Sequence, residues 1–61
     1  MIIVHEIDPK HGTSLQLAKE FSVSPEWVCK CCSGKSNSHK AKSIRQRAYE
    51  LNGRLIRWEE K

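Results

Sequence analysis

Three cysteines, Cys29, Cys31 and Cys32, lie close together near the middle of the chain, and His39 follows them. Thiolates and imidazoles are good zinc ligands, so this cluster is the first candidate for metal chemistry. Its spacing argues against a metal site, because side chains separated by about 100° on a helix do not converge on one ion. We therefore predict no metal and no cofactor, with Cys31 and Cys32 packed as small apolar residues in the core. A zinc-stabilised module is the weaker alternative.

Catalytic chemistry needs combinations of groups that this sequence does not supply. A catalytic thiol needs a positioned base, and the chain shows no paired carboxylates, nucleophile–base pair or phosphate loop. His5 and His11 are isolated, so we predict that they are surface residues. We expect that the protein is not an enzyme and binds no small-molecule ligand.

Positive charge is concentrated in one segment. The chain of 61 residues carries a formal net charge of +4, and residues 27–48 contain basic side chains and no acid. A clustered basic segment indicates a polyanionic partner, most simply double-stranded DNA, although a solvated helical face is the plainer alternative. The basic residues of this segment are Lys30, Lys35, Lys40, Lys42, Arg45 and Arg47.

The segment just before and including the cysteines predicts two short helices joined by a tight turn. Thr13 is a suitable N-cap for the first helix, and Gln16 completes a capping-box pattern. Ser24 is a second N-cap, and Pro25 takes the first helical position, where its missing N–H costs no hydrogen bond. Gly34 follows the second helix as a left-handed stop.

A third helix follows a short polar segment and ends at Asn52 and Gly53. Its apolar residues recur at helical spacing and form one stripe, with the basic residues off that stripe. The stripe consists of Ala41, Ile44, Ala48 and Leu51. We predict that it closes a core with Leu15, Ala18, Phe21, Val28, Cys31 and Cys32.

The two ends of the chain predict short strands. The N-terminal segment is β-branched and the C-terminal segment alternates, so we expect them to pair antiparallel within one chain. Either Ile3 or Val4, and one of Leu55, Ile56 or Trp58, would then cover the helices. Pairing of an exposed edge with a symmetry mate is the alternative. The predicted boundaries are about 1–7 and 54–59 for the strands, and 14–21, 25–32 and 38–52 for the helices.

These features resemble the DNA-binding headpiece of Lac-repressor-like and lambda-repressor/Cro-like regulators. The resemblance runs through LQLAKEFSVSPEWVCKCCSGKSNSHKAKSIRQRAYELNG and includes an I-R-x-x-A signature in the third helix. Ala18 stands where the motif has a small residue, and Val28 where it has a buried β-branched residue. Ser22 replaces the glycine usual in the turn, where a positive φ is expected and is mildly strained. The resemblance implies a mainly α, three-helix helix-turn-helix domain with a small two-stranded antiparallel sheet.

The resemblance also implies that the second helix, Ser24 to Cys32, enters the major groove. The implied base-reading residues are Pro25, Glu26, Cys29 and Lys30. Residues implied to contact the DNA backbone are Gln16, Ser24, Trp27, Lys35, Ser36, Asn37, Ser38 and Lys40. For Trp27, an equally weighted alternative is that it is a partly buried aromatic residue that supports the turn. For residues 33–38, the alternative is a free linker.

The expected whole is one small domain spanning residues 1–61. A chain of this size builds a modest core, and DNA recognition through half-sites favours a homodimer. The absence of a long apolar run, a secretory signal and an even cysteine set predicts a protein of the bacterial cytoplasm or nucleoid. We predict a phage- or mobile-element-like transcriptional regulator. The alternative is a protein-interaction module, such as an antirepressor or adaptor, that uses the same fold without DNA.

Overall fold

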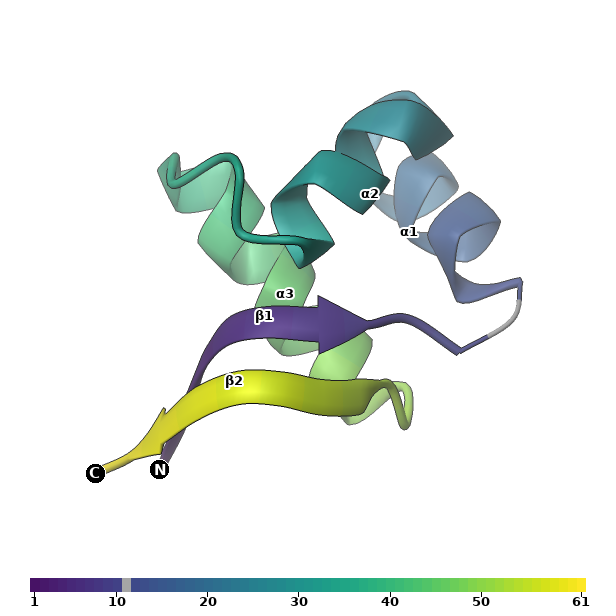
Figure 1. Cartoon of the computed structure of the whole chain (residues 1–61). Coiled ribbons are helices and arrows are strands. Elements are labelled where there is room, and N and C mark those ends of the chain that lie inside the picture. Colours follow the sequence, from purple (N-terminus) through teal and green to yellow (C-terminus); the bar gives the residue numbers. More distant parts are fainter. Residues whose placement is uncertain (11) are drawn as a thin grey trace.

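The computed structural model describes residues 1–10 and 12–61, so His11 lies outside the described residues. It contains three helices and a two-stranded antiparallel sheet built from the two ends of one chain (Figure 1). The predicted combination of elements, and their pairing within one chain, are therefore confirmed. Predicted element ends differ from the observed ones by at most two residues, and those of the second helix coincide. The elements are β1 (Ile2–Asp8), α1 (Thr13–Phe21), α2 (Pro25–Cys32), α3 (His39–Glu50) and β2 (Arg54–Glu60).

The helix starts follow from local hydrogen bonds, with one correction. The Ser24 side chain accepts a hydrogen bond from the Trp27 amide at 3.2 Å, as expected of the N-cap of α2. The prediction that Thr13 caps α1 is wrong, because Thr13 is the first helical residue and Gly12 precedes it with a φ of 85°. Gln16 makes no capping box either, since its Nε2 donates to Glu20 Oε2 at 3.2 Å.

Residues with positive φ occupy the chain reversals. Ser22, between α1 and α2, has a φ of 56°, as expected where the turn lacks a glycine. The Val23 amide donates to the Ala18 carbonyl at 2.9 Å and closes this turn. Gly34 after α2 and Asn52 after α3 have φ values of 84° and 66°, so both predicted helix stops are confirmed.

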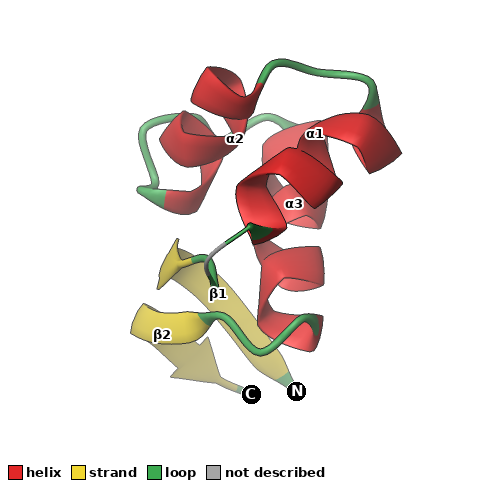
Figure 2. Ribbon diagram, turned by 90° about the vertical axis from the view of Figure 1, so that its right-hand side faces the viewer, coloured by secondary structure: helices red, strands yellow, loops and turns green. Residues whose placement is uncertain are grey.

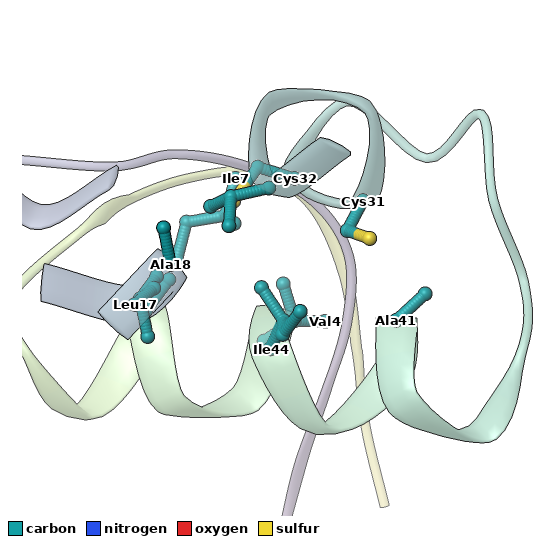
Figure 3. Close-up of a cluster of buried hydrophobic side chains, with 10 residues drawn as sticks. Val4, Ile7, Leu17, Ala18, Cys31, Cys32, Ala41 and Ile44 are labelled. Carbon is teal, nitrogen blue, oxygen red and sulfur yellow. The ribbon is translucent and has the colours of Figure 1, made fainter. Parts of the chain in front are cut away.

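The core lies where all three helices meet β1 (Figure 3). The predicted stripe of α3 is largely confirmed, because Ala41, Ile44 and Ala48 are fully buried and Leu51 packs at the margin. The assignment of Leu15 to the core is wrong, since this residue is 60% exposed. Leu15 lies two residues before the buried Leu17, about 200° away around the helix, so only one of the two can face the core. The buried apolar residues are Val4, Ile7, Leu17, Ala18, Val28, Cys31, Cys32, Ala41, Ile44 and Ala48.

The sheet presents its inner strand to the helices and its outer strand to solvent (Figure 2). β1 packs on α2 and α3, whereas β2 packs chiefly on β1. Val4 and Ile7 are both buried although they are three residues apart, an odd spacing that regular alternation would place on opposite faces. The pairing register shifts on either side of Glu6, and these irregularities allow both side chains to face the core.

The predicted strand packing is observed, with one member of each set of alternatives facing the helices. Val4 on β1 and Leu55 on β2 cover the helices, the latter as a partly buried residue. Ile56 and Trp58 instead remain 51% and 48% exposed, because β2 is the outer strand. Within residues 1–10 and 12–61, no helix combines the length and apolar character needed to cross a bilayer.

Candidate nucleic-acid interface

The outward face of α2 displays all four side chains predicted to read bases. Pro25, Glu26, Cys29 and Lys30 are exposed, and their spacing places them on one side of the helix. The opposite side carries the buried residues Val28, Cys31 and Cys32, which fix the rotation of α2 about its axis. Burial of three side chains thus decides which face of this short helix is presented to solvent.

Two serines predicted to contact DNA phosphates also start helices. The Ser24 hydroxyl oxygen accepts from the Trp27 amide, and that of Ser38 accepts from the Ala41 amide at 3.2 Å. Each hydroxyl keeps its own proton, which remains able to donate to a phosphate oxygen. Trp27 is partly buried and packs against the core, which is the packing expected of its structural alternative.

Arg45 is the main correction to the predicted basic segment. We expected it off the apolar stripe of α3, but the residue is only 2% exposed. Its Nε donates to the Val4 carbonyl at 3.1 Å, and its Nη1 donates to the carbonyls of Cys31 and Ser36 at 2.9 and 2.7 Å. The guanidinium therefore joins β1, the end of α2 and the following loop to α3.

The position of Arg45 also explains why its charge can be buried. Cys31 lies in the last turn of α2, where free carbonyls carry the negative end of the helix dipole. Three carbonyl oxygens around one guanidinium replace the water that this ion loses on burial. Arg45 is thus a positioning residue that orients α2 and the loop through Cys31 and Ser36.

Sequence periodicity contained a signal for this burial. Arg45 follows Ala41 by four residues and precedes Ala48 by three, so it shares the helical face of the apolar stripe. A stripe defined only by its apolar residues does not include Arg45, although Arg45 lies on the same face of the helix. Arg45 is also the arginine of the I-R-x-x-A signature, and its role in this chain is to hold backbone carbonyls.

Arg47 is likewise occupied within the fold. Its Nε donates to Glu20 Oε1 on α1 at 3.1 Å, and its Nη1 donates to Glu50 Oε2 at 3.1 Å. The hydrogen bond with Glu20, together with that to Glu50, raises the pKa of the Arg47 guanidinium. The expected basic segment therefore contains two arginines that serve the fold.

Four lysines remain as the outward charge of the segment. Lys30 lies on α2, Lys35 in the loop, and Lys40 and Lys42 on the first half of α3. All four are exposed, and none makes a salt bridge to the residues that the structure describes. Glu26 is the acid on the outward face of α2. The available positive charge is thus carried by lysines on α2 and on the segment that follows it.

The three cysteines divide between the core and the surface. Cys31 and Cys32 are buried as predicted, while Cys29 is exposed on the outward face of α2. Burial raises the pKa of the Cys31 thiol, and it raises that of Cys32 to about 11 with a smaller contribution from the neighbouring Cys29. Both buried thiols therefore remain protonated at neutral pH and act as small apolar side chains.

Comparisons of the chain with protein-family models, with curated proteins and with solved structures find no match.

Proposed function

We propose that this chain is a small DNA-binding transcriptional regulator in which α1 and α2 form a helix-turn-helix and α2 enters the major groove. The observation that carries the proposal is the solvent-facing side of α2, flanked by exposed lysines without partners among the described residues. Such an array attracts phosphates and presents side chains to base edges.

The side chains on the outward face of α2 differ in what they can read. Lys30 can donate to guanine O6 and N7, which makes it the strongest base-reading candidate. Glu26 can accept from cytosine N4, although its charge is repelled by phosphates. Pro25 offers an apolar contact to a thymine methyl group, and Cys29 lines the groove beside it. Specificity should therefore depend mainly on Lys30 and Glu26.

The remaining contacts are assigned to the DNA backbone. Lys35 and Lys40 supply charge, and Asn37 supplies an amide donor from the loop. The Ser36 carbonyl accepts a hydrogen bond from Arg45, so a buried side chain holds the loop between α2 and α3. The full proposed backbone set is Gln16, Ser24, Trp27, Lys35, Ser36, Asn37, Ser38 and Lys40. One copy would cover one half-site, and two copies would bind a symmetric operator.

Fluorescence anisotropy with a mixed-sequence duplex across a salt series tests the proposal. We expect weak binding with a log–log salt slope of roughly −3 to −6, corresponding to about 4–6 phosphates per copy. Lys35→Ala and Lys40→Ala should each flatten the slope by about 1, whereas Lys61→Ala, at the far end of the sheet, should leave it unchanged.

Selection from a random duplex library then tests base reading. Lys30→Ala should weaken binding to the selected sequence by about 1–3 kcal/mol and relax the preference at one position. Absence of binding by the unmodified protein at low salt would refute the DNA proposal and leave the protein-interaction module as the alternative.

A further inference from the structure

The two edges of the sheet are not equivalent. On β1, Arg45 donates to the Val4 carbonyl, and the loop after α2 lies so close that a Cβ on Gly34 would come within 2.9 Å of the His5 oxygen. β2 borders the sheet on its other side and faces away from the helices (Figures 1 and 2). Helix and loop therefore cover the edge at β1, while among residues 1–10 and 12–61 no strand pairs with the outer edge of β2, whose backbone groups can accept another strand.

We propose that the outer edge of β2 pairs antiparallel with β2 of a second copy, about a two-fold axis that passes between the two Trp58 residues. This arrangement joins the two sheets into one of four strands. It places Arg57 of each copy opposite Glu59 of the other, and it places the two Trp58 residues opposite each other. The contact is isologous, so a single short sequence supplies both halves of the interface.

Charge selects this register over its neighbours. An axis between the two Arg57 residues would oppose two arginines, and an axis between the two Glu59 residues would oppose two glutamates. Like charges directly opposite each other are unfavourable across a strand pair. With the axis between the two Trp58 residues, two Arg57–Glu59 pairs form instead. The two Trp58 side chains, each about half-exposed in the single chain, also bury aromatic surface against each other. The order Arg57-Trp58-Glu59 is therefore complementary to itself when reversed.

The side chains involved are available in the single chain. Those of Arg57 and Glu59 are 66% and 56% exposed. Their partners within the chain are distant, with Arg57 Nε 3.9 Å from a Glu6 oxygen and Glu59 Oε2 3.7 Å from His5 Nε2. Neither distance is that of a hydrogen bond, so pairing across the axis displaces only weak contacts.

The backbone of β2 can support this ladder over a short length. β2 pairs regularly with β1 from Trp58 to Glu60, and the register then shifts twice. The shift between Trp58 and Arg57 comes from an extra residue on β1, and the shift between Arg57 and Leu55 comes from an extra residue on β2. A ladder from Arg57 to Glu59, centred on Trp58, therefore contains no inserted residue of β2. Because so short an interface lies below the ~1,200 Å² typical of stable complexes, we expect a dissociation constant of about 1–100 µM.

Sedimentation equilibrium without DNA tests the register through charge reversal. Arg57→Glu and Glu59→Arg should each raise the dissociation constant more than about tenfold, because each opposes like charges twice. An equimolar mixture of the two variants should recover association, since the mixed dimer again pairs opposite charges. Lys10→Glu, at an exposed lysine outside the sheet, makes the same charge change as Arg57→Glu and should leave association unchanged. A monomeric unmodified protein at about 200 µM, or a mixture that does not associate, would overturn the proposal.

Cross-linking supplies a measurement that does not depend on charge. Trp58→Cys should form a disulfide between copies under mild oxidation, because opposed residues in an antiparallel pair have Cβ atoms as close as about 4.5 Å, the upper end of the range that a disulfide spans. The exposed Cys29 is replaced by serine in this background, and Leu15→Cys on α1 serves as the control that should not cross-link. Equal cross-linking at both positions, or none at Trp58→Cys, would count against the β2 interface. Because no DNA is present, these outcomes are independent of the proposed function.

Discussion

Replacement of Arg45 by alanine removes a guanidinium that joins separate parts of the fold. Hydrogen bonds to a charged group contribute about 1.5–3 kcal/mol each, and a buried acceptor left without a donor costs about 1–3 kcal/mol. Cys31 keeps a second donor, the Gly34 amide at 3.2 Å, so its carbonyl loses less than those of Val4 and Ser36. Relief of the desolvated charge offsets part of the loss. We expect the free energy of unfolding to fall by about 3–5 kcal/mol.

A loss of this size should be visible as unfolding at ambient temperature. Domains of this length rarely hold more than about 3–5 kcal/mol of stability, so Arg45→Ala should be largely unfolded at 25 °C. Urea titration followed by helical circular dichroism measures the change. Arg45→Lys keeps the charge but lacks the planar fork, and should lie between the alanine variant and the unmodified protein.

Arg47→Ala is the matched control for this substitution. It lies on the same helix, and its guanidinium makes two exposed ion pairs, so it should destabilise the fold far less than Arg45→Ala. If Arg45→Ala costs less than about 1 kcal/mol, or no more than Arg47→Ala, the argument that buried carbonyl contacts position α2 is wrong.

Three further predictions concern burial, backbone strain and pH. Leu17→Ala should cost about 2–5 kcal/mol in urea titration, whereas Leu15→Ala should cost about 0.5 kcal/mol or less; equal costs would contradict the assignment of faces on α1. Gly34→Ala should lower the melting temperature at a cost of about 1–3 kcal/mol, because its φ is 84° and the new Cβ would lie 2.9 Å from the His5 oxygen; an unchanged melting temperature would argue against this close approach. Burial raises the pKa of Cys32 from 9.0 to about 11, so its protonated thiol contributes stability that is fully present below pH 9. About 2–3 kcal/mol of the free energy of unfolding is then lost as pH rises through 11. Cys32→Ala should flatten this alkaline loss, and a pH profile identical to that of the unmodified protein would contradict the prediction.

The local signals in the sequence were reliable where the interaction they describe is itself local. Ser24 caps α2 through an amide three residues away, and Gly34 stops the same helix through its own backbone angles. The prediction that Thr13 caps α1 was wrong, because Gly12 precedes the helix with a left-handed backbone and no side chain caps it. Cap patterns therefore predicted the start of α2 correctly and the start of α1 incorrectly.

The exposure of the candidate interface could be anticipated from the sequence, whereas its charge could be anticipated only in part. Val28, Cys31 and Cys32 are apolar or nearly so, and their burial leaves Lys30 on the outward side of α2. The fate of Arg45 depends on a carbonyl of β1 that is far away in sequence, a partner that the composition of α3 does not reveal. Counting basic residues in the segment therefore overstated the charge available to a polyanion.

The sequence alone determined the order of elements, the helix stops, the apolar stripe of α3 and the core positions of two cysteines. These features depend on periodicity and on contacts between near neighbours, which a linear reading contains. The tertiary structure decided that one arginine is buried and another paired, that Leu15 faces outward, and that β2 is left with an open edge. Those outcomes depend on which distant backbone and side-chain groups meet, because a buried charge is stable only where folding brings several carbonyls to it.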